Sequence, residues 1–271
     1  DFPTRAEWLT DQLAPRWRSN TITAIPGTMK RLQTNPWFGL ASPNQAGRAE
    51  ALEFTELIRR AVLRLADRIG NPVVKYVQLH SAPTRYAEPR YLAASLSQLR
   101  ECDWAGARLV VEHCDQYVPG QEPEKGFLAL EDDIEVAAES DVEVHINWGR
   151  SCLEARDPAR ALAGISQARA RGVLSGVVFS GVSATPTSFG PAWADAHLPA
   201  TPDEPGSLLS GDAIRQCALA AVGPDVDGRP AGYLGAKVST GTDLPPDRRL
   251  QFIRTVFAST ADTVPAWSGE R

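Results

Sequence analysis

The amino-acid sequence predicts an α/β fold in which parallel strands alternate with helices. Short apolar runs rich in β-branched residues alternate about six times with longer amphipathic segments along the 271 residues. Successive runs are not joined by the short turns that mark hairpins. This alternation is typical of a parallel sheet with helical crossovers, either a doubly wound sheet or an eight-stranded barrel. The length also suffices for one large core, and we expect residues 1–271 to form a single domain.

The first half of the chain opens with a predicted helix over Asp1–Arg18, where Trp8, Leu9, Leu13 and Trp17 are spaced for one face. Gly and Pro then punctuate the pattern and set the boundaries of the next elements. These are a strand over Thr21–Ile25 that Pro26 and Gly27 end, a loop over Lys30–Gln45, a helix over Gly47–Ile69 that Gly70 ends, a strand over Val73–His80 and a helix over Tyr91–Cys102.

The second half repeats the alternation and contains the longest irregular stretch of the chain. Residues Gly181–Pro205 are rich in Pro, Ser and Thr and exceed a plain connector in length, which predicts an active-site loop or lid. The regular elements are a strand beginning at Ala107, a helix over Leu128–Ala138, a strand over Val142–Trp148, a helix over Pro158–Arg171, a strand over Leu174–Ser180, a helix over Gly211–Ala221, a strand over Tyr233–Ser239 and a helix over Pro245–Ala261.

Composition excludes several classes of function. The formal net charge of -5 argues against a general nucleic-acid binder, which needs clustered Lys and Arg. No apolar run is long enough for a membrane span, no signal-peptide pattern opens the chain, and no GxGxxG or GxxxxGK[ST] motif supports nucleotide binding. The four cysteines lack CxxC spacing, so neither a disulfide nor a zinc framework is expected. We expect a cytoplasmic protein with a small-molecule partner and neither nucleic-acid nor membrane partners. A homo-oligomer is possible. The start at Asp1 without Met suggests a fragment or a processed form.

The stretch Ala107–Asp115 carries the first functional candidate. It opens as a buried strand and ends abruptly in ionisable side chains. Open α/β sheets and β/α barrels present their chemistry at the carboxyl ends of such strands. Because side chains alternate along a strand, Glu112 and His113 face opposite ways. We predict Glu112 to be functional and His113 to pack behind the sheet.

Five segments of the chain form a recognisable set, namely Ala24–Met29, Leu79–Pro83, Leu109–Asp115, His145–Ser151 and Phe179–Gly181. They resemble an uncharacterised bacterial family of unknown function within the xylose-isomerase-like sugar isomerases and epimerases. The resemblance implies a (β/α)8 TIM barrel of the xylose-isomerase-like type. It also implies that the six strands here are the third to eighth, so that the first two strands of the barrel are missing from this chain.

The same resemblance bears on metal binding. The wider superfamily usually holds one divalent cation through a Glu, an Asp, a His and a Glu on its last four strands. Glu112 matches the first ligand, but Asn147 stands at the second position, Phe179 and Ser180 at the third, and Lys237 and Ser239 at the fourth. This set is poor for cations that prefer several hard oxygen ligands. We expect no cofactor, while Mg²⁺ or Mn²⁺ stays an alternative.

Glu112 and Lys237 are the predicted catalytic residues. Glu112 would take a proton from a carbon next to a carbonyl, and the Lys237 ammonium would stabilise the oxyanion. A Schiff base on Lys237, as in a lyase or aldolase, is a second possibility. A structural ion pair between the two residues is the third.

Three residues near strand ends are predicted to bind substrate. His80 ends its strand, Asn147 can orient a sugar hydroxyl, and Arg150 suits a carboxylate or phosphate. For Arg150 a salt bridge at the rim is an equally good interpretation. His145 shares a strand face with Asn147 but lies deeper, and we favour a hydrogen-bonded core histidine there.

The long loop contributes two further predicted substrate-binding residues. In Trp193–His197 a spacing of two would place Trp193, Asp195 and His197 on one side of an extended segment. Such a lid would stack Trp193 on a sugar and offer His197 as a polar contact, whereas an ordinary surface loop is the alternative.

Together these features predict a sugar isomerase- or epimerase-like enzyme acting on a small carbohydrate or a derivative of one. A barrel that binds sugar without catalysis is the main alternative, because the metal pattern is lost.

Overall fold

The computed structural model describes residues 2–13, 17–224, 226–240 and 243–261. These residues form two compact units, and the chain passes between them at three points, two of which lie inside strands. Unit 1 comprises Asp1–Glu112 and Lys125–Glu143, and unit 2 comprises His113–Glu124 and Val144–Arg271. None of the helices in these described ranges combines the length and the apolar character needed to cross a membrane.

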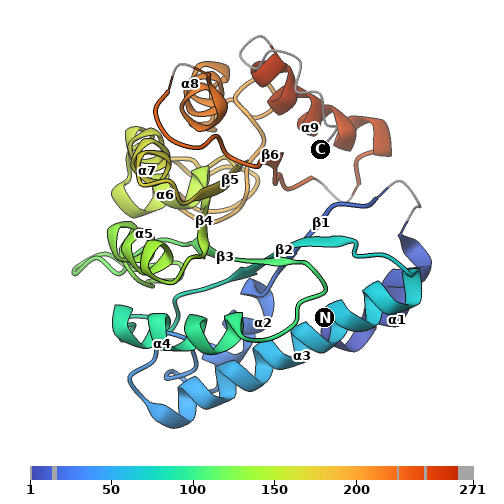
Figure 1. Cartoon of the computed structure of the whole chain (residues 1–271). Helices are drawn as coiled ribbons and strands as arrows, with labels where there is room; N and C mark the ends of the chain where they lie inside the picture. The colour runs from blue at the N-terminus through green and yellow to red at the C-terminus, as the bar shows by residue number, and fades with distance from the viewer. Residues whose placement is uncertain (1, 14–16, 225, 241–242, 262–271) are drawn as a thin grey trace. The chain divides into compact units, whose positions relative to one another are not determined.

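Unit 1 contains three parallel strands with helices between them (Figure 1). Strand β2 pairs with β1 on one side and with β3 on the other, so that Val77 lies opposite both Ile22 and Leu109. The elements are α1 (Phe2–Gln12), β1 (Asn20–Thr23), α2 (Ile25–Leu32), α3 (Gln45–Ile69), β2 (Val74–Leu79), α4 (Pro89–Arg100), β3 (Arg108–His113) and α5 (Leu130–Glu139).

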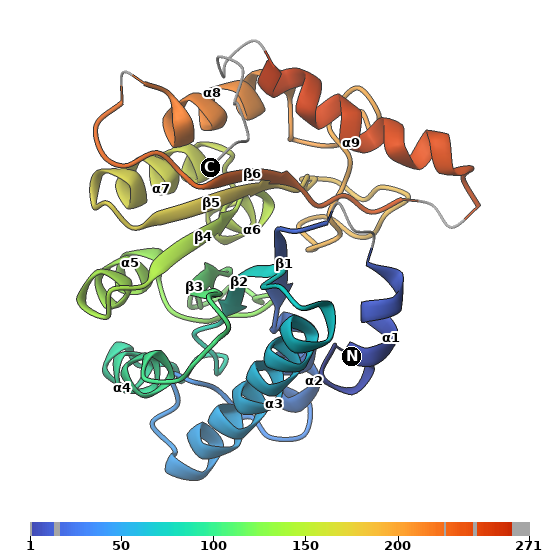
Figure 2. The ribbon, with the colours of Figure 1, turned by 45° about the vertical axis from the view of Figure 1, so that its right-hand side comes forward.

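The long helix α3 has clear sequence signals at both ends. The Asn44 side chain accepts a hydrogen bond from the Gly47 N–H at 2.9 Å, and Gly70 ends the helix in the left-handed conformation that favours glycine. Helix α1 packs along α3, as Figure 2 shows. The buried face of α3 recurs every three or four residues and consists of Gly47, Ala51, Phe54, Thr55, Ile58, Ala61, Val62 and Leu65.

Helix α2 corrects part of the sequence prediction. The chain does not break at Pro26 and Gly27 but enters a helix at Ile25, and the predicted loop over Lys30–Gln45 therefore begins too early. Pro26 lies in the first turn, where its missing N–H leaves no helical bond unmade. Gly27 lies against the Phe54 ring, which a side chain at that position would strike. Tertiary packing thus explains Gly27, which by local propensity alone predicts the end of an element.

Unit 2 also contains three strands paired in parallel, with β5 between β4 and β6. Helix α6 follows β4 without a linker, and β6 ends before Lys237, earlier than the predicted Ser239. The elements are β4 (Glu143–Asn147), α6 (Trp148–Ala155), α7 (Ala159–Ala170), β5 (Leu174–Phe179), α8 (Gly211–Val222), β6 (Tyr233–Ala236) and α9 (Pro246–Ala261). Helix α7 packs against α6 and α8, and α8 packs against α9.

Between β5 and α8 the chain is irregular, as the sequence predicts for Gly181–Pro205. The segment is nevertheless tied down. Gly181 and Leu198 form an antiparallel bridge with two backbone hydrogen bonds of 2.8 and 2.9 Å. A second bridge joins Thr187 to Gly190. A long loop with internal bridges and buried residues holds its side chains in fixed places.

Candidate active site

Glu112 is held by the two strands that precede it in unit 1. Its Oε2 lies 2.7 Å from His80 Nε2 and accepts a hydrogen bond of 3.1 Å from the Thr23 hydroxyl. Thr23 is the last residue of β1, His80 directly follows β2, and Glu112 stands at the end of β3. Only 2% of Glu112 and 3% of His80 is exposed. The carboxyl ends of three parallel strands therefore bring a carboxylate, an imidazole and a hydroxyl together in a dry environment.

This arrangement suits proton transfer. A carboxylate can act as a base, and an imidazole can donate or accept a proton at Nε2 depending on its tautomer. Because Glu112 and His80 are in hydrogen-bond contact, a proton taken by the carboxylate can be shared with the ring without leaving the pair. The Thr23 hydroxyl fixes the carboxyl orientation. The structure therefore brings together Glu112 and His80, two residues that the sequence analysis predicts to be functional.

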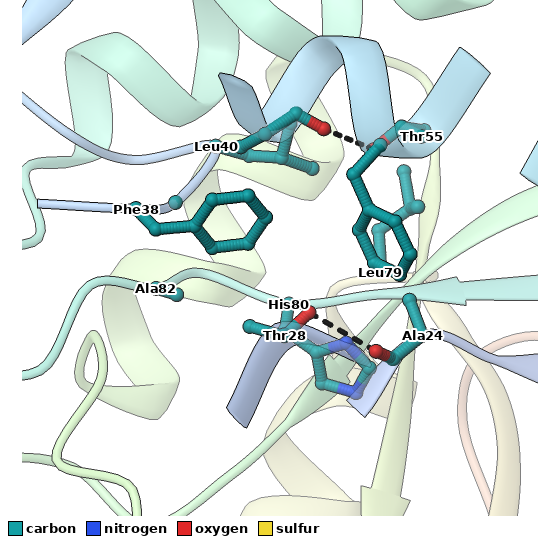
Figure 3. A pocket seen from close by; sticks show the side chains of 11 residues that line it. Ala24, Thr28, Phe38, Leu40, Thr55, Leu79, His80 and Ala82 are labelled. Atoms are coloured by element: carbon teal, nitrogen blue, oxygen red, sulfur yellow. Dashed lines mark hydrogen bonds between the residues drawn. The ribbon is translucent and has the colours of Figure 1, made fainter. Parts of the chain in front are cut away.

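Behind His80 lies a small apolar cavity of about 10 Å³ (Figure 3). That volume holds one water at most. Phe38, Leu40, Phe54 and Leu79 are among its lining residues. The Thr28 and Thr55 hydroxyls on its wall are bonded to carbonyls of their own helices, as the dashed lines in Figure 3 indicate. The cavity is thus a packing space that supports His80 and is too small for a substrate.

Ser81 is a polar residue that sequence reasoning did not predict to be functional. It follows His80, is fully buried, and its hydroxyl has no hydrogen-bond partner in the described part of the chain. A buried hydroxyl without a partner costs free energy unless a ligand or water satisfies it. Ser81 is therefore a candidate contact for a bound polar molecule.

Asn147 occupies the junction between β4 and α6 in unit 2. Its Oδ1 accepts hydrogen bonds from the backbone N–H groups of Gly149 and Arg150, which caps α6. Its Nδ2 is buried and lacks a hydrogen-bond partner among the described residues. An amide that is fixed on one side and unsatisfied on the other can donate to a ligand hydroxyl, in keeping with the predicted substrate contact.

Arg150 and the long loop form a second polar cluster in unit 2. Arg150 Nε lies 3.0 Å from Asp195 Oδ2, and its Nη1 donates to Cys114 Sγ at 3.3 Å. His197 Nδ1 lies 3.2 Å from Asp195 Oδ1 and 2.8 Å from Ser180 Oγ. Because Ser180 and Asp195 meet the same nitrogen of His197, this is not the relay geometry of a hydrolase triad. The cluster fixes the loop to α6 and to the end of β5.

Two other predicted site residues, Trp193 and Lys237, make different contacts. The Trp193 ring lies 5.9 Å from the Arg156 guanidinium, a cation–π contact that attaches it to the end of α6. Lys237 follows β6 with partial exposure, and its backbone N–H donates to Phe179 O at 2.9 Å. The predicted partnership of Lys237 with Glu112 joins residues of the two units and stays a prediction.

His113 forms a buried pair of a different kind. Its Nε2 lies 3.1 Å from Glu154 Oε2 on α6, an oxygen that also accepts the Gln116 N–H. Arg160 donates to the other oxygen of Glu154 at 2.8 Å. Burial alone raises the pKa of Glu154, but the His113 and Arg160 contacts outweigh it and hold that pKa below its usual value. The packing role predicted for His113 is confirmed.

His145 also has a structural partner, Tyr233, which the sequence analysis did not identify. The Tyr233 hydroxyl lies 2.6 Å from His145 Nδ1, and the two rings stack with centroids 5.4 Å apart. Gly176 lies opposite both residues in the sheet register. A side chain on Gly176 would strike the Tyr233 ring, so the glycine leaves the space that the aromatic ring fills. The sequence signal for this contact was Gly176 inside one predicted strand together with the aromatic Tyr233 in the next predicted strand.

The fold is that of the xylose-isomerase-like TIM barrels. The structure resembles that of D-psicose 3-epimerase crystallised in the presence of D-fructose, with a TM-score of 0.51 and 13% identity over 97% of this chain and 93% of that chain. It also resembles a xylose isomerase domain containing protein from Salmonella typhimurium LT2, with a TM-score of 0.54 and 10% identity over 96% and 92% of the two chains. At these identities the likeness establishes the fold class alone.

Within that class, the chain belongs to a family described as a domain of unknown function (DUF4862), whose model matches residues 2–252. An uncharacterized protein of Salmonella typhimurium (strain LT2) is 33% identical over 225 residues, which cover 81% of this chain and 70% of that protein. The resemblance predicted from the sequence is thereby confirmed for both the family and the fold.

The residues present do not fit the divalent metal that the fold class implies. Among the described residues, no group of three or more His, Cys, Asp or Glu side chains is arranged to hold a metal ion. Glu112, the one position that matches a ligand, has its Oε2 engaged by His80 and Thr23. The Asn147 Oδ1 is already used to cap α6, and the ammonium of Lys237 has no lone pair to offer a cation. We therefore derive the chemistry of this chain from its own side chains.

Proposed function

We propose that this chain catalyses an isomerase- or epimerase-like proton transfer next to the carbonyl of a small carbohydrate. The observation that carries the proposal is the buried hydrogen bond of 2.7 Å between Glu112 and His80 at the carboxyl ends of β3 and β2. A buried carboxylate paired with an imidazole, placed where this fold class carries its chemistry, is suited to acid–base catalysis.

In the proposed mechanism Glu112 removes the proton and His80 receives or returns it. The Thr23 hydroxyl keeps the carboxyl group in one orientation. Ser81 Oγ, in the residue next to His80, supplies an unsatisfied polar atom for a substrate hydroxyl. The role of Lys237 as stabiliser of the oxyanion remains a prediction from the sequence, to be tested with Lys237→Gln.

The test is incorporation of solvent deuterium into sugars, followed by NMR. D-fructose and D-psicose are the first probes, because a D-psicose 3-epimerase shares the fold, and common pentoses and hexoses follow. We expect the wild type to exchange the hydrogen next to the carbonyl of at least one sugar. Glu112→Gln should slow that exchange about 1,000-fold, since general acid–base groups contribute roughly 10²–10⁴-fold.

Glu154→Gln is the matched control, because Glu154 is also a buried glutamate paired with a histidine. It should retain the exchange rate of the wild type at a temperature where both variants are folded. Loss of exchange in the control but not in Glu112→Gln would refute the assignment. Sugar binding without any exchange by the wild type would instead favour a non-catalytic sugar-binding protein. Trapping of an adduct by borohydride that depends on Lys237 would favour a lyase or aldolase.

A further inference from the structure

Unit 1 carries an exposed pair of stacked aromatic side chains. The rings of Trp37 and Tyr86 lie 4.5 Å apart with an angle of 29° between their planes. Trp37 is 38% exposed and Tyr86 is 49% exposed. Large aromatic side chains are usually buried to a greater extent, so the stacked pair presents an apolar face to solvent.

The pair stands on a rigid support. The Ala41 N–H donates to Ala82 O, and the Glu88 N–H donates to Ala41 O, each at 2.9 Å. A side chain at Gly39 would collide with the Ala82 carbonyl, so the two loops are in close backbone contact. The aromatic pair is therefore fixed before any ligand arrives, which lowers the entropy cost of binding.

A short loop connects the pair to the candidate active site. Tyr86 belongs to the loop that follows β2, and His80 is the first residue of that loop. Six residues of fully extended chain span roughly 20 Å at most. The distance from the paired histidine to the aromatic pair is thus within the length of a short oligosaccharide.

The surroundings of the pair favour a sugar ring over a protein partner. Polar and charged side chains occur on the segments around it, including the hydrogen-bonded Asn35 and Glu50 and the ion pair of Glu88 with Arg90. A stable protein interface buries about 800 Å² on each partner, with a large apolar centre. A small aromatic face with polar groups at its edge instead matches a pyranose, which has an apolar C–H face and hydroxyls around its rim.

We propose that Trp37 and Tyr86 form a second sugar subsite. The substrate class would then be a disaccharide, a short oligosaccharide or a glycoside with a sugar-like aglycone. Its reacting sugar binds at Glu112 and His80, and another ring of the same molecule packs on the aromatic pair. This inference rests on the proposed function for the identity of the reacting sugar, but binding at the aromatic pair can be measured without catalysis.

The test compares the affinities of matched monosaccharide and disaccharide probes by calorimetric titration. The probes are methyl glucosides with maltose and cellobiose, methyl xyloside with xylobiose, and methyl galactoside with lactose. We expect at least one disaccharide to bind roughly tenfold more tightly than its monosaccharide. Trp37→Ala and Tyr86→Ala should each remove most of that gain and leave the monosaccharide affinity unchanged. Trp8→Ala, which removes an exposed tryptophan on α1, should retain the full gain in disaccharide affinity.

Several outcomes overturn the subsite. One is a wild type that binds no disaccharide of the panel better than its monosaccharide. Another is a Trp37→Ala variant, folded by circular dichroism, that keeps the full gain. A Trp37→Ala variant that changes the oligomeric state but not the sugar affinity would assign the pair to contact with a second copy. If disaccharides bind as expected but deuterium exchange is absent, the proposed function fails and the subsite stands. If monosaccharides exchange deuterium and no disaccharide binds more tightly than its monosaccharide, the subsite fails and the proposed function stands.

Discussion

Two buried glutamate–histidine pairs of this chain show how surroundings decide what a residue does. Both oxygens of Glu154 are engaged, one by His113 and the Gln116 N–H and the other by Arg160. That carboxylate joins α6 to the segment after β3 and stabilises the packing there. Glu112 instead lies with His80 and Thr23 at strand ends, beside a buried hydroxyl that no described residue satisfies. The first pair is structural, and the second is the candidate for chemistry.

The Glu154 pair gives a stability prediction with a defined pH dependence. The folded-state pKa of Glu154 lies below its ordinary value of 4.5. Its ionised form therefore contributes stability that is fully present above pH 4.5 and is lost as the pH falls through the folded-state pKa. We expect Glu154→Gln to lower the free energy of unfolding by about 3 kcal/mol at pH 7, as for other buried pairs that lose one partner.

Urea unfolding at several pH values checks this prediction. The difference between wild type and Glu154→Gln should shrink as the pH falls below 4.5. A difference that stays constant over this range, or grows toward acid pH, would mean that the charge of Glu154 is not what stabilises the pair.

At the scale of residues, strand-end position made Glu112 and His80 predictable. Their direct contact was not, because it depends on the register of β2 with β3. The bond between Arg150 and Asp195 spans 45 positions and depends on how the long loop folds back, which no local pattern specifies. Ser81 and Tyr233 were missed because one is a common loop residue and the other is a normal strand residue by type.

At the scale of elements, a few glycines allow close backbone contact between loops. Gly39 lets its loop approach the loop after β2, where a Cβ would strike the Ala82 carbonyl. Because backbone cannot move aside as a flexible side chain can, we expect Gly39→Ala to lower the free energy of unfolding by about 2 kcal/mol. Thermal unfolding followed by circular dichroism measures the effect.

Gly211→Ala is the matched control. Gly211 is the first residue of α8, and the nearest atom to an added Cβ is the end of the Ser259 side chain at 3.3 Å. Alanine has a higher helix propensity than glycine, so this variant should be as stable as the wild type or slightly more stable. Equal losses in the two variants would show that the contact between the loops does not determine the cost at Gly39.

The strands and the long helices were predictable because their apolar periodicity is set by burial. The short helices α2 and α6 were not. Each follows a strand with at most one residue between, so the pattern changes from a period of two to a period of 3.6 within one or two residues. Asn147 ends the strand and caps α6 at the same time, and its type alone does not distinguish those roles.

At the scale of the whole chain, the alternation of strands and helices predicts the fold class, and the resemblance narrows it to the xylose-isomerase-like barrels. The comparisons confirm both. The activity is a separate matter, because one fold class carries many reactions and function depends on the particular site. The donor set differs from the metal-binding pattern of the class, and we propose that the chemistry comes from the pair of Glu112 with His80.

The most direct test of that claim is the rate of solvent deuterium incorporation in Glu112→Gln, His80→Asn and the double variant, measured on a sugar that the wild type exchanges. If the two residues act as one proton-transfer unit, each single variant should lose most of the rate, and the double variant should be no slower than the slower single variant. Wild-type exchange in Glu112→Gln, or losses in the double variant that multiply, would contradict the account.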